Sequence, residues 1–267
     1  MWKWDAQQSP KAVVAIIHGA YEYHYWYMWL IEQLRANGYH VVMGDLPGHG
    51  EVKRSEHIHN ESFHDYEVFV NQTLKVAMTH DLPVFVIGQG LGATLVMQGI
   101  RKKSIECAGI ILLSPWLQLH NTPSKLSGAL ASMSKIVGNM KLTHQLSLSD
   151  MTNNENTYPE LQKQPIFSTN ITVSWYKELQ HLMREMNNEQ IKIPNIPTLV
   201  MTGGQDRITN TAASRKWVLQ QHLSEFHYKE WPNCRHNLHM EEEREEIFHY
   251  MNDFMANILR SLGYIIE

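Results

Sequence analysis

One stretch decides the fold of this chain of 267 residues: Pro83-Val84-Phe85-Val86-Ile87-Gly88-Gln89-Gly90-Leu91-Gly92. Its first five residues form a short apolar run, which is typical of a strand buried on both faces of a parallel sheet. Three glycines then alternate with Gln89 and Leu91, and a helical pattern continues to Arg101. The stretch therefore predicts a strand that passes through a sharp turn directly into a helix.

The glycine-rich turn fits two kinds of site. In the nucleophile elbow, Gly-x-Ser-x-Gly, the outer glycines allow close packing and the middle residue takes a strained conformation at a helix N-terminus. A dinucleotide-binding turn has the spacing Gly-x-Gly-x-x-Gly, whereas here the third glycine comes one residue early. The unit is also third in the series of strands rather than first. We therefore favour the elbow, with Gly90 at the position of the serine.

Apolar runs and helical patterns alternate along most of the chain. Strands are expected at residues 12–17, 40–43, 83–87, 108–113, 198–202 and 226–231. Helical patterns are expected over residues 26–37, 63–74, 91–101 and 247–258. This alternation predicts an α/β fold with right-handed crossovers and a mostly parallel, doubly wound sheet.

The alternation stops between Leu119 and Asn195. Helical stripes run over residues 126–140 and 175–186, and a polar stretch, residues 150–157, separates them. We see no run typical of a buried strand in this part. The pattern predicts a core of residues 1–119 and 196–267, with a helical cap (lid), residues 120–195, inserted over the carboxyl edge of the sheet, where α/β sheets bind ligands.

Composition excludes several classes of protein. Hydrophobic residues make up 43% and charged residues 19%, with a formal net charge of -4. Because no block of five or more basic residues occurs, nucleic-acid binding has no electrostatic support. No apolar run of 18 residues predicts a membrane span, and residues 1–5 lack the apolar segment of a secretory signal. We expect a cytoplasmic protein in which Cys107 and Cys234 are reduced.

The 16 histidines raise the question of a metal site. His57 and His59, like His236 and His239, lack cysteine or carboxylate partners at ligand spacing. We therefore expect histidines scattered over the surface, no metal and no cofactor. The acidic run of residues 241–246 is expected to be the solvated first turn of a helix, where acidic side chains suit the helix dipole.

Five motifs occur in a characteristic order: His18-Gly19-Ala20 followed by Glu22, His24 and Tyr27; Asp45-Leu46-Pro47-Gly48-His49-Gly50; the turn of residues 88–92; Gly203-Gly204-Gln205-Asp206; and His236 before the acidic helix. Over nearly the whole chain they resemble the α/β-hydrolase superfamily, in particular a bacterial monoacylglycerol lipase or lysophospholipase. The order of elbow, Asp and His is that of α/β hydrolases. The chain departs from the family at Gln89, usually His, at Ala93, often Gly, and at Glu51, usually Ser.

The resemblance implies a carboxylic ester hydrolase with a Ser-His-Asp triad. His236 would be the general base, Asp206 would orient its ring, and the nucleophile position is Gly90. The backbone N–H groups of Ala20 and Leu91 would stabilise the oxyanion.

The resemblance further implies a small-molecule, single-chain lipid ester as substrate. The cap would contact a membrane peripherally, and its helices around Met133 and Trp175 would line an acyl tunnel. Filling of an irregular core is the alternative role for such side chains. The loop of the first long strand would add substrate contacts at His18 and Gly19.

Gly90 changes what the resemblance implies. Glycine tolerates the positive φ of an elbow, but it has no nucleophile, and loss of a triad nucleophile costs on the order of 10⁶ in turnover. Neither Ser114 nor Cys234 takes the elbow position. The chain is therefore expected to be inactive or strongly impaired. Four interpretations stay open: a pseudoenzyme that binds a lipid or a partner, an engineered replacement, hydrolysis by water that His236 activates, and non-hydrolytic chemistry of the His–Asp pair.

Overall fold

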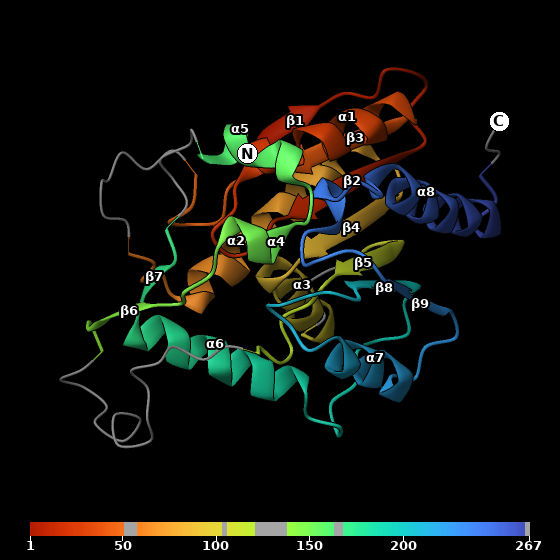
Figure 1. The fold of residues 1–267 in the computed structure, drawn as a ribbon. Coiled ribbons are helices and arrows are strands. Elements are labelled where there is room, and N and C mark those ends of the chain that lie inside the picture. Colours follow the sequence, from red (N-terminus) through yellow and green to blue (C-terminus); the bar gives the residue numbers. More distant parts are fainter. Residues whose placement is uncertain (51–57, 103–105, 121–137, 163–167, 265–267) are drawn as a thin grey trace.

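A seven-stranded sheet forms the centre of the molecule (Figure 1). The computed structural model describes residues 1–50, 58–102, 106–120, 138–162 and 168–264. The order in the sheet is β1-β3-β2-β4-β5-β8-β9, and only the pairing of β1 with β3 is antiparallel. The strands are β1 (Trp2–Trp4), β2 (Ala12–Ile17), β3 (Tyr39–Met43), β4 (Val84–Gln89), β5 (Gly109–Leu113), β8 (Thr198–Gly203) and β9 (Phe226–Trp231). The predicted α/β-hydrolase fold with a mostly parallel sheet is confirmed.

Helices cover both faces of the sheet (Figure 1). One face carries α1 (Met28–Ala36) and α8 (Arg244–Ser261), and the other carries α2 (Phe63–Ala77), α3 (Leu91–Arg101) and α7 (Thr211–Gln220). Strand β2 explains why two cores form. Its side chains alternate between them, with Val13 and Ala15 in one and Val14 and Ile16 in the other. None of the described helices combines the length and the apolar character needed to cross a bilayer.

The segment expected to form the cap is only partly helical. Its described elements are β6 (Lys141–Thr143), α4 (Leu148–Met151), α5 (Tyr158–Gln162), β7 (Asn170–Thr172) and α6 (Val173–Met186). Helix α6 confirms the stripe expected at residues 175–186. No run typical of a buried strand was expected here, and the two strands found, β6 and β7, are short and pair with each other in an antiparallel ladder. Strands of three residues are too short to produce a recognisable period. Most of the stripe at 126–140 lies outside the described residues, and the cap boundaries at 120 and 195 stay a prediction.

Two of the contacts between this segment and the core lie at His59 and at Trp175. His59 donates its N–H to the Asn170 carbonyl at 2.9 Å and accepts from the Thr172 N–H at 3.0 Å, which extends the small ladder by one residue of the core. Trp175 of α6 donates its indole N–H to the Tyr66 hydroxyl of α2 at 2.9 Å. Because Trp175 is also only 1% exposed, its side chain is part of the packing between cap and core.

Helix α3 begins very close to the end of β2. A Cβ on Gly92 would overlap the carbonyl oxygens of Ile17 and His18, so only glycine allows this approach. The preceding Gly90 has φ 53° and ψ −117°, which is the left-handed conformation expected of an elbow. The close approach places the first turn of α3 beside the loop that follows β2.

Replacing Gly92 by alanine is expected to lower the free energy of unfolding by about 3 kcal/mol, because the new methyl group would force main-chain atoms apart. Gly109→Ala is the matched control, since its Cβ would meet a side-chain atom of Ile258 at 3.1 Å. Urea denaturation followed by circular dichroism measures both. Equal losses in the two variants would contradict a backbone constraint at Gly92.

Candidate active site

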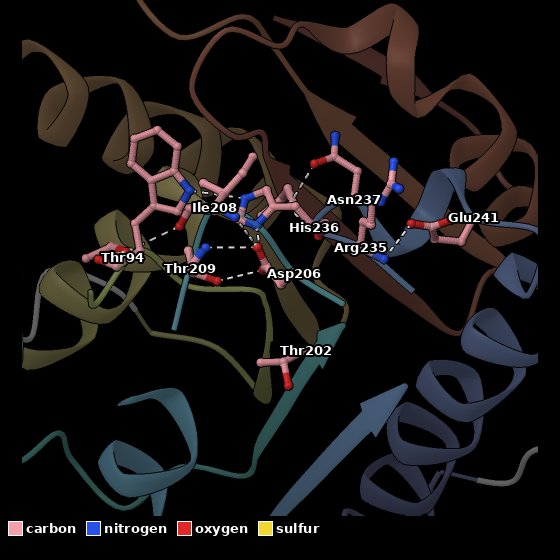
Figure 2. Close-up of polar contacts among 12 residues, drawn as sticks. Thr94, Thr202, Asp206, Ile208, Thr209, Arg235, His236, Asn237 and Glu241 are labelled. Atoms are coloured by element: carbon pink, nitrogen blue, oxygen red, sulfur yellow. Dashed lines mark hydrogen bonds and ion pairs between the residues drawn. The ribbon is translucent and has the colours of Figure 1, made fainter. Parts of the chain in front are cut away.

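Three residues that are far apart in sequence meet at the carboxyl edge of the sheet. Gly90 follows β4, Asp206 follows β8 and His236 follows β9, and these strands are parallel. The His236 Nδ1 lies 2.8 Å from the Asp206 Oδ2 (Figure 2). A Cβ on Gly90 would lie 3.0 Å from the His236 Nε2. The three positions thus lie as expected for an elbow, an acid and a base, and the catalytic roles of Asp206 and His236 stay a prediction.

Asp206 is a buried carboxylate with a full set of hydrogen bonds. Its Oδ1 accepts from the N–H groups of Ile208 and Thr209 at 2.7 and 2.8 Å, and its Oδ2 accepts from the Thr209 hydroxyl at 2.6 Å (Figure 2). Burial alone would raise the pKa of Asp206, but the attraction of His236 and the hydrogen bonds from His236 and Thr209 outweigh it and hold the pKa below its usual value. The alternative role as a helix cap is filled by Asn210, which caps α7.

Trp116 contacts the other ring nitrogen of His236. The Trp116 Nε1 lies 3.1 Å from the His236 Nε2. Because an indole N–H only donates, Nε2 is the acceptor in this contact, and Nδ1 is the ring nitrogen that faces Asp206. Trp116 is 1% exposed and was not identified from the sequence. The only signal was its place directly after β5, on the edge where Gly90 was expected.

Gln89 forms hydrogen bonds with the loop that carries His236. Its amide nitrogen donates to the His236 carbonyl at 3.2 Å and lies 3.4 Å from the Asn237 Oδ1. Gln89 is fully buried. The residue that departs from the family pattern beside the elbow therefore stabilises the backbone of the histidine loop.

Glu22 connects the histidine loop to the loop after β2. The Glu22 carboxylate accepts from the Gly19 N–H at 3.0 Å, from the Asn237 side-chain amide at 2.9 Å and from the Tyr27 hydroxyl. Burial raises the pKa of Glu22, although the hydrogen bonds from Tyr27 and Gly19 oppose the rise. One buried carboxyl group thus fixes both loops that border the elbow.

A second buried carboxyl group fixes the cap segment to the histidine loop. Glu241 accepts from the backbone N–H groups of Arg235 at 2.7 Å and Asn153 at 3.0 Å (Figure 2). The Arg235 guanidinium donates to the Ser149 carbonyl. Glu241 has no exposed surface, and α8 begins only at Arg244. The expectation that the acidic run is wholly solvated is therefore wrong at Glu241, because its carboxylate is needed by buried N–H groups.

The backbone N–H groups of Ala20 and Leu91 flank the elbow. Neither donates a hydrogen bond to another described residue of the chain. Leu91 is the first residue of α3, where the N–H has no partner within the helix and the dipole favours negative charge. Their role as oxyanion donors stays a prediction.

Tyr21, next to Ala20, has a φ of 68°, and its hydroxyl lies 2.9 Å from the His144 Nδ1. This conformation fits a loop under local strain.

The side chain of His18 is used within the protein. Its Nε2 accepts from the Leu46 N–H at 2.8 Å, and its Nδ1 lies 2.7 Å from the Gly19 carbonyl. Burial lowers the pKa of His18 well below its usual value, so the ring is neutral. His18 shapes the loop after β2, and a substrate contact at His18 or Gly19 stays a prediction. Met133, which was expected to line an acyl tunnel, lies outside the described residues.

Among the histidines that were not assigned to the site, four are buried, and for these the expectation of a surface position is wrong: His49, His59, His144 and His239. His59 pairs with β7 through its backbone, and the ring of His239 stacks on that of Tyr27 with centroids 4.2 Å apart. In the part of the chain that the structure describes, no three His, Cys, Asp or Glu side chains form a group that fits a metal ion.

No other described side chain replaces the nucleophile at the elbow. Cys234 donates its thiol to the Glu243 carboxylate at 3.6 Å. Burial raises the pKa of Cys234 above its usual range, and Glu243 adds to the rise, so the thiol stays protonated. Ser114 is fully buried at the end of β5, where its N–H donates to the Met201 carbonyl at 2.8 Å.

The sheet, the elbow and the His–Asp pair together define an α/β hydrolase. The family model described as "Serine aminopeptidase, S33" matches residues 8–243, and the chain belongs to this family. The chain is 36% identical to "Phospholipase YtpA" of Bacillus subtilis over 93% of its own length and 96% of that protein. It is 22% identical to human "Monoglyceride lipase", over 97% of this chain and 87% of the relative.

A solved structure of similar fold is a soluble variant of monoglyceride lipase from Saccharomyces cerevisiae in complex with a substrate analog. The TM-score is 0.83 at 19% identity, over 96% of this chain and 90% of that one. Monoacylglycerol lipase from Paleococcus ferrophilus gives a TM-score of 0.78 at 21% identity, over 96% and 98%. At these identities the likeness concerns the fold alone.

Replacing Asp206 by asparagine is expected to lower the free energy of unfolding by about 2 kcal/mol near neutral pH, because buried donors lose their charged acceptor. The folded pKa of Asp206 lies below its unfolded value. Its stabilising contribution is therefore complete above the unfolded pKa and is lost as the pH falls through the folded pKa. The difference in the free energy of unfolding between the unchanged chain and Asp206→Asn should therefore narrow below pH of about 4.

Urea unfolding at a series of pH values measures this difference. Asp81→Asn is the control, since Asp81 is exposed in a turn. A difference for Asp206→Asn that stays constant down to pH of about 3 would show that the carboxylate charge is not what stabilises the site.

Proposed function

We propose that this chain binds single-chain lipid esters of the monoacylglycerol or lysophospholipid type in a lipase-type site and does not form an acyl-enzyme. The observation that carries the proposal is the 3.1 Å hydrogen bond from Trp116 to His236 beside Gly90. The base that would activate a serine hydroxyl here accepts an indole N–H instead. The ancestral reaction is hydrolysis of a carboxylic ester.

The choice of ligand rests on the names of the similar proteins and on the backbone N–H groups beside the elbow. The names of the similar proteins, phospholipase and monoglyceride lipase, point to lipid esters. The N–H groups of Ala20 and Leu91 would receive the carbonyl oxygen of such an ester. Neither group requires a side chain, so both persist when the elbow residue is glycine. The cap segment would cover the acyl chain and contact a membrane peripherally.

The chemistry of the elbow argues against turnover. A Ser-His-Asp site splits the reaction through a covalent intermediate, and removal of the nucleophile lowers turnover on the order of 10⁶-fold. A water molecule activated by His236 is the second candidate, supported by the charged Asp206 that orients the ring. This route needs the lone pair of Nε2, which the Trp116 N–H already engages. Direct water activation therefore requires Trp116 to move first.

The chain is expected to bind a lysophospholipid and a monoacylglycerol of medium chain length without releasing fatty acid. Isothermal titration calorimetry below the critical micelle concentration measures binding, and chromatography of the mixture measures release. Glycerol and glycerophosphocholine are the control ligands, because they carry the head group without the acyl chain.

Two outcomes would contradict this proposal. Absence of binding to both lipids, with a folded protein, would exclude a lipid-binding role. Release of fatty acid that disappears in His236→Ala would instead support hydrolysis by activated water.

A further inference from the structure

We propose that the indole N–H of Trp116 occupies the hydrogen-bonding position of a nucleophile hydroxyl, so that the indole and a hydroxyl at position 90 compete for the Nε2 of His236. Trp116 is then the residue that occupies the hydrogen-bond acceptor of His236. This inference deepens the proposed function and rests on it for the identity of the site. It adds a requirement for activity: besides a serine at position 90, the indole of Trp116 has to leave the Nε2 of His236.

The distances around Gly90 carry the argument. A Cβ at this position would lie 3.0 Å from the His236 Nε2 and 3.1 Å from the Trp116 Nε1. Both values are tighter than ordinary contacts, so a neighbour has to give way. The Nε2 of a neutral imidazole has one lone pair in the ring plane, and it accepts one well-aligned hydrogen bond. A serine hydroxyl and the indole N–H would therefore compete for the same acceptor.

The main chain of Trp116 is anchored to the elbow. Its N–H donates to the Gly90 carbonyl at 3.2 Å, and its carbonyl accepts from the Thr94 hydroxyl at 3.1 Å. Thr94 lies in the first turn of α3, which is seated against β2. Because both ends of the peptide unit are held, the indole leaves His236 by side-chain rotation rather than by movement of the strand end.

The ring of Trp116 also contacts the cap side of the site. Its centroid lies 5.7 Å from that of His144, which belongs to the segment between β6 and α4, and 6.2 Å from that of Tyr21. Tyr21 follows the predicted oxyanion residue Ala20. Rotation of the indole therefore disturbs the packing between the oxyanion loop and the cap segment, and a ligand that engages His236 has to drive this rotation.

A purely structural role for Trp116 is the alternative. A buried indole N–H needs an acceptor, and His236 would merely be the nearest one. The two roles differ in chemistry. If the indole only fills space, its removal changes stability and leaves the reactivity of a serine at position 90 unchanged. If it occupies the base, its removal speeds the reaction of that serine.

The test compares the rate of labelling by a small fluorophosphonate probe in chains that carry Gly90→Ser. We expect Gly90→Ser/Trp116→Phe to label at least about tenfold faster than Gly90→Ser, the equivalent of one competing hydrogen bond. Gly90→Ser/Trp217→Phe is the matched control, since Trp217 is also a buried tryptophan, in the core on α7. It should label at the rate of Gly90→Ser. Trp116→Phe alone should not label.

Equal labelling rates for Gly90→Ser with and without Trp116→Phe, or no labelling of either, would overturn the inference when circular dichroism shows folded proteins. A crystal structure of Gly90→Ser provides a second measurement that needs no change at Trp116. The indole should be rotated away from the His236 Nε2, and an indole still bonded there would overturn the inference. The small probe does not depend on lipid binding, so failure here and failure of the proposed function are distinguishable.

Discussion

The site depends on the close approach of α3 to the end of β2. Gly92 makes this approach possible, since a Cβ would overlap the carbonyl oxygens of Ile17 and His18. The approach fixes the direction in which Gly90 leaves β4, and it brings the unpaired N–H of Leu91 beside the loop that holds Ala20. The carboxyl ends of β8 and β9 then need only short loops to place Asp206 and His236 on the same edge.

Two buried carboxyl groups keep this frame together. Glu22 joins the loop after β2 to Asn237, and Glu241 joins the cap segment to the backbone of Arg235. Burial raises the pKa of both carboxyl groups, so each is costly to keep charged and is held by several N–H donors.

The elbow tip is defined by its hydrogen bonding as well as by its glycine. Gly90 leaves room beside His236, and Trp116 uses that room to satisfy its indole N–H. Asp206 still fixes the proton on Nδ1, so the imidazole remains oriented as a base that has no free lone pair. The site thus combines an oriented His–Asp pair with a ring nitrogen, Nε2, that already accepts a hydrogen bond from Trp116.

Sequence alone determined the class of fold, because buried strands, the glycine spacing at residues 88–92 and the order of Asp206 and His236 are local patterns with a mechanism. It also identified Gly90 as the anomaly. Only the tertiary structure decided that Trp116 contacts His236 and that Glu241 is buried, since these depend on which loops meet after the strands align. The ladder of β6 and β7 likewise escaped prediction, because three residues carry no period and their pairing comes from distant parts of the chain.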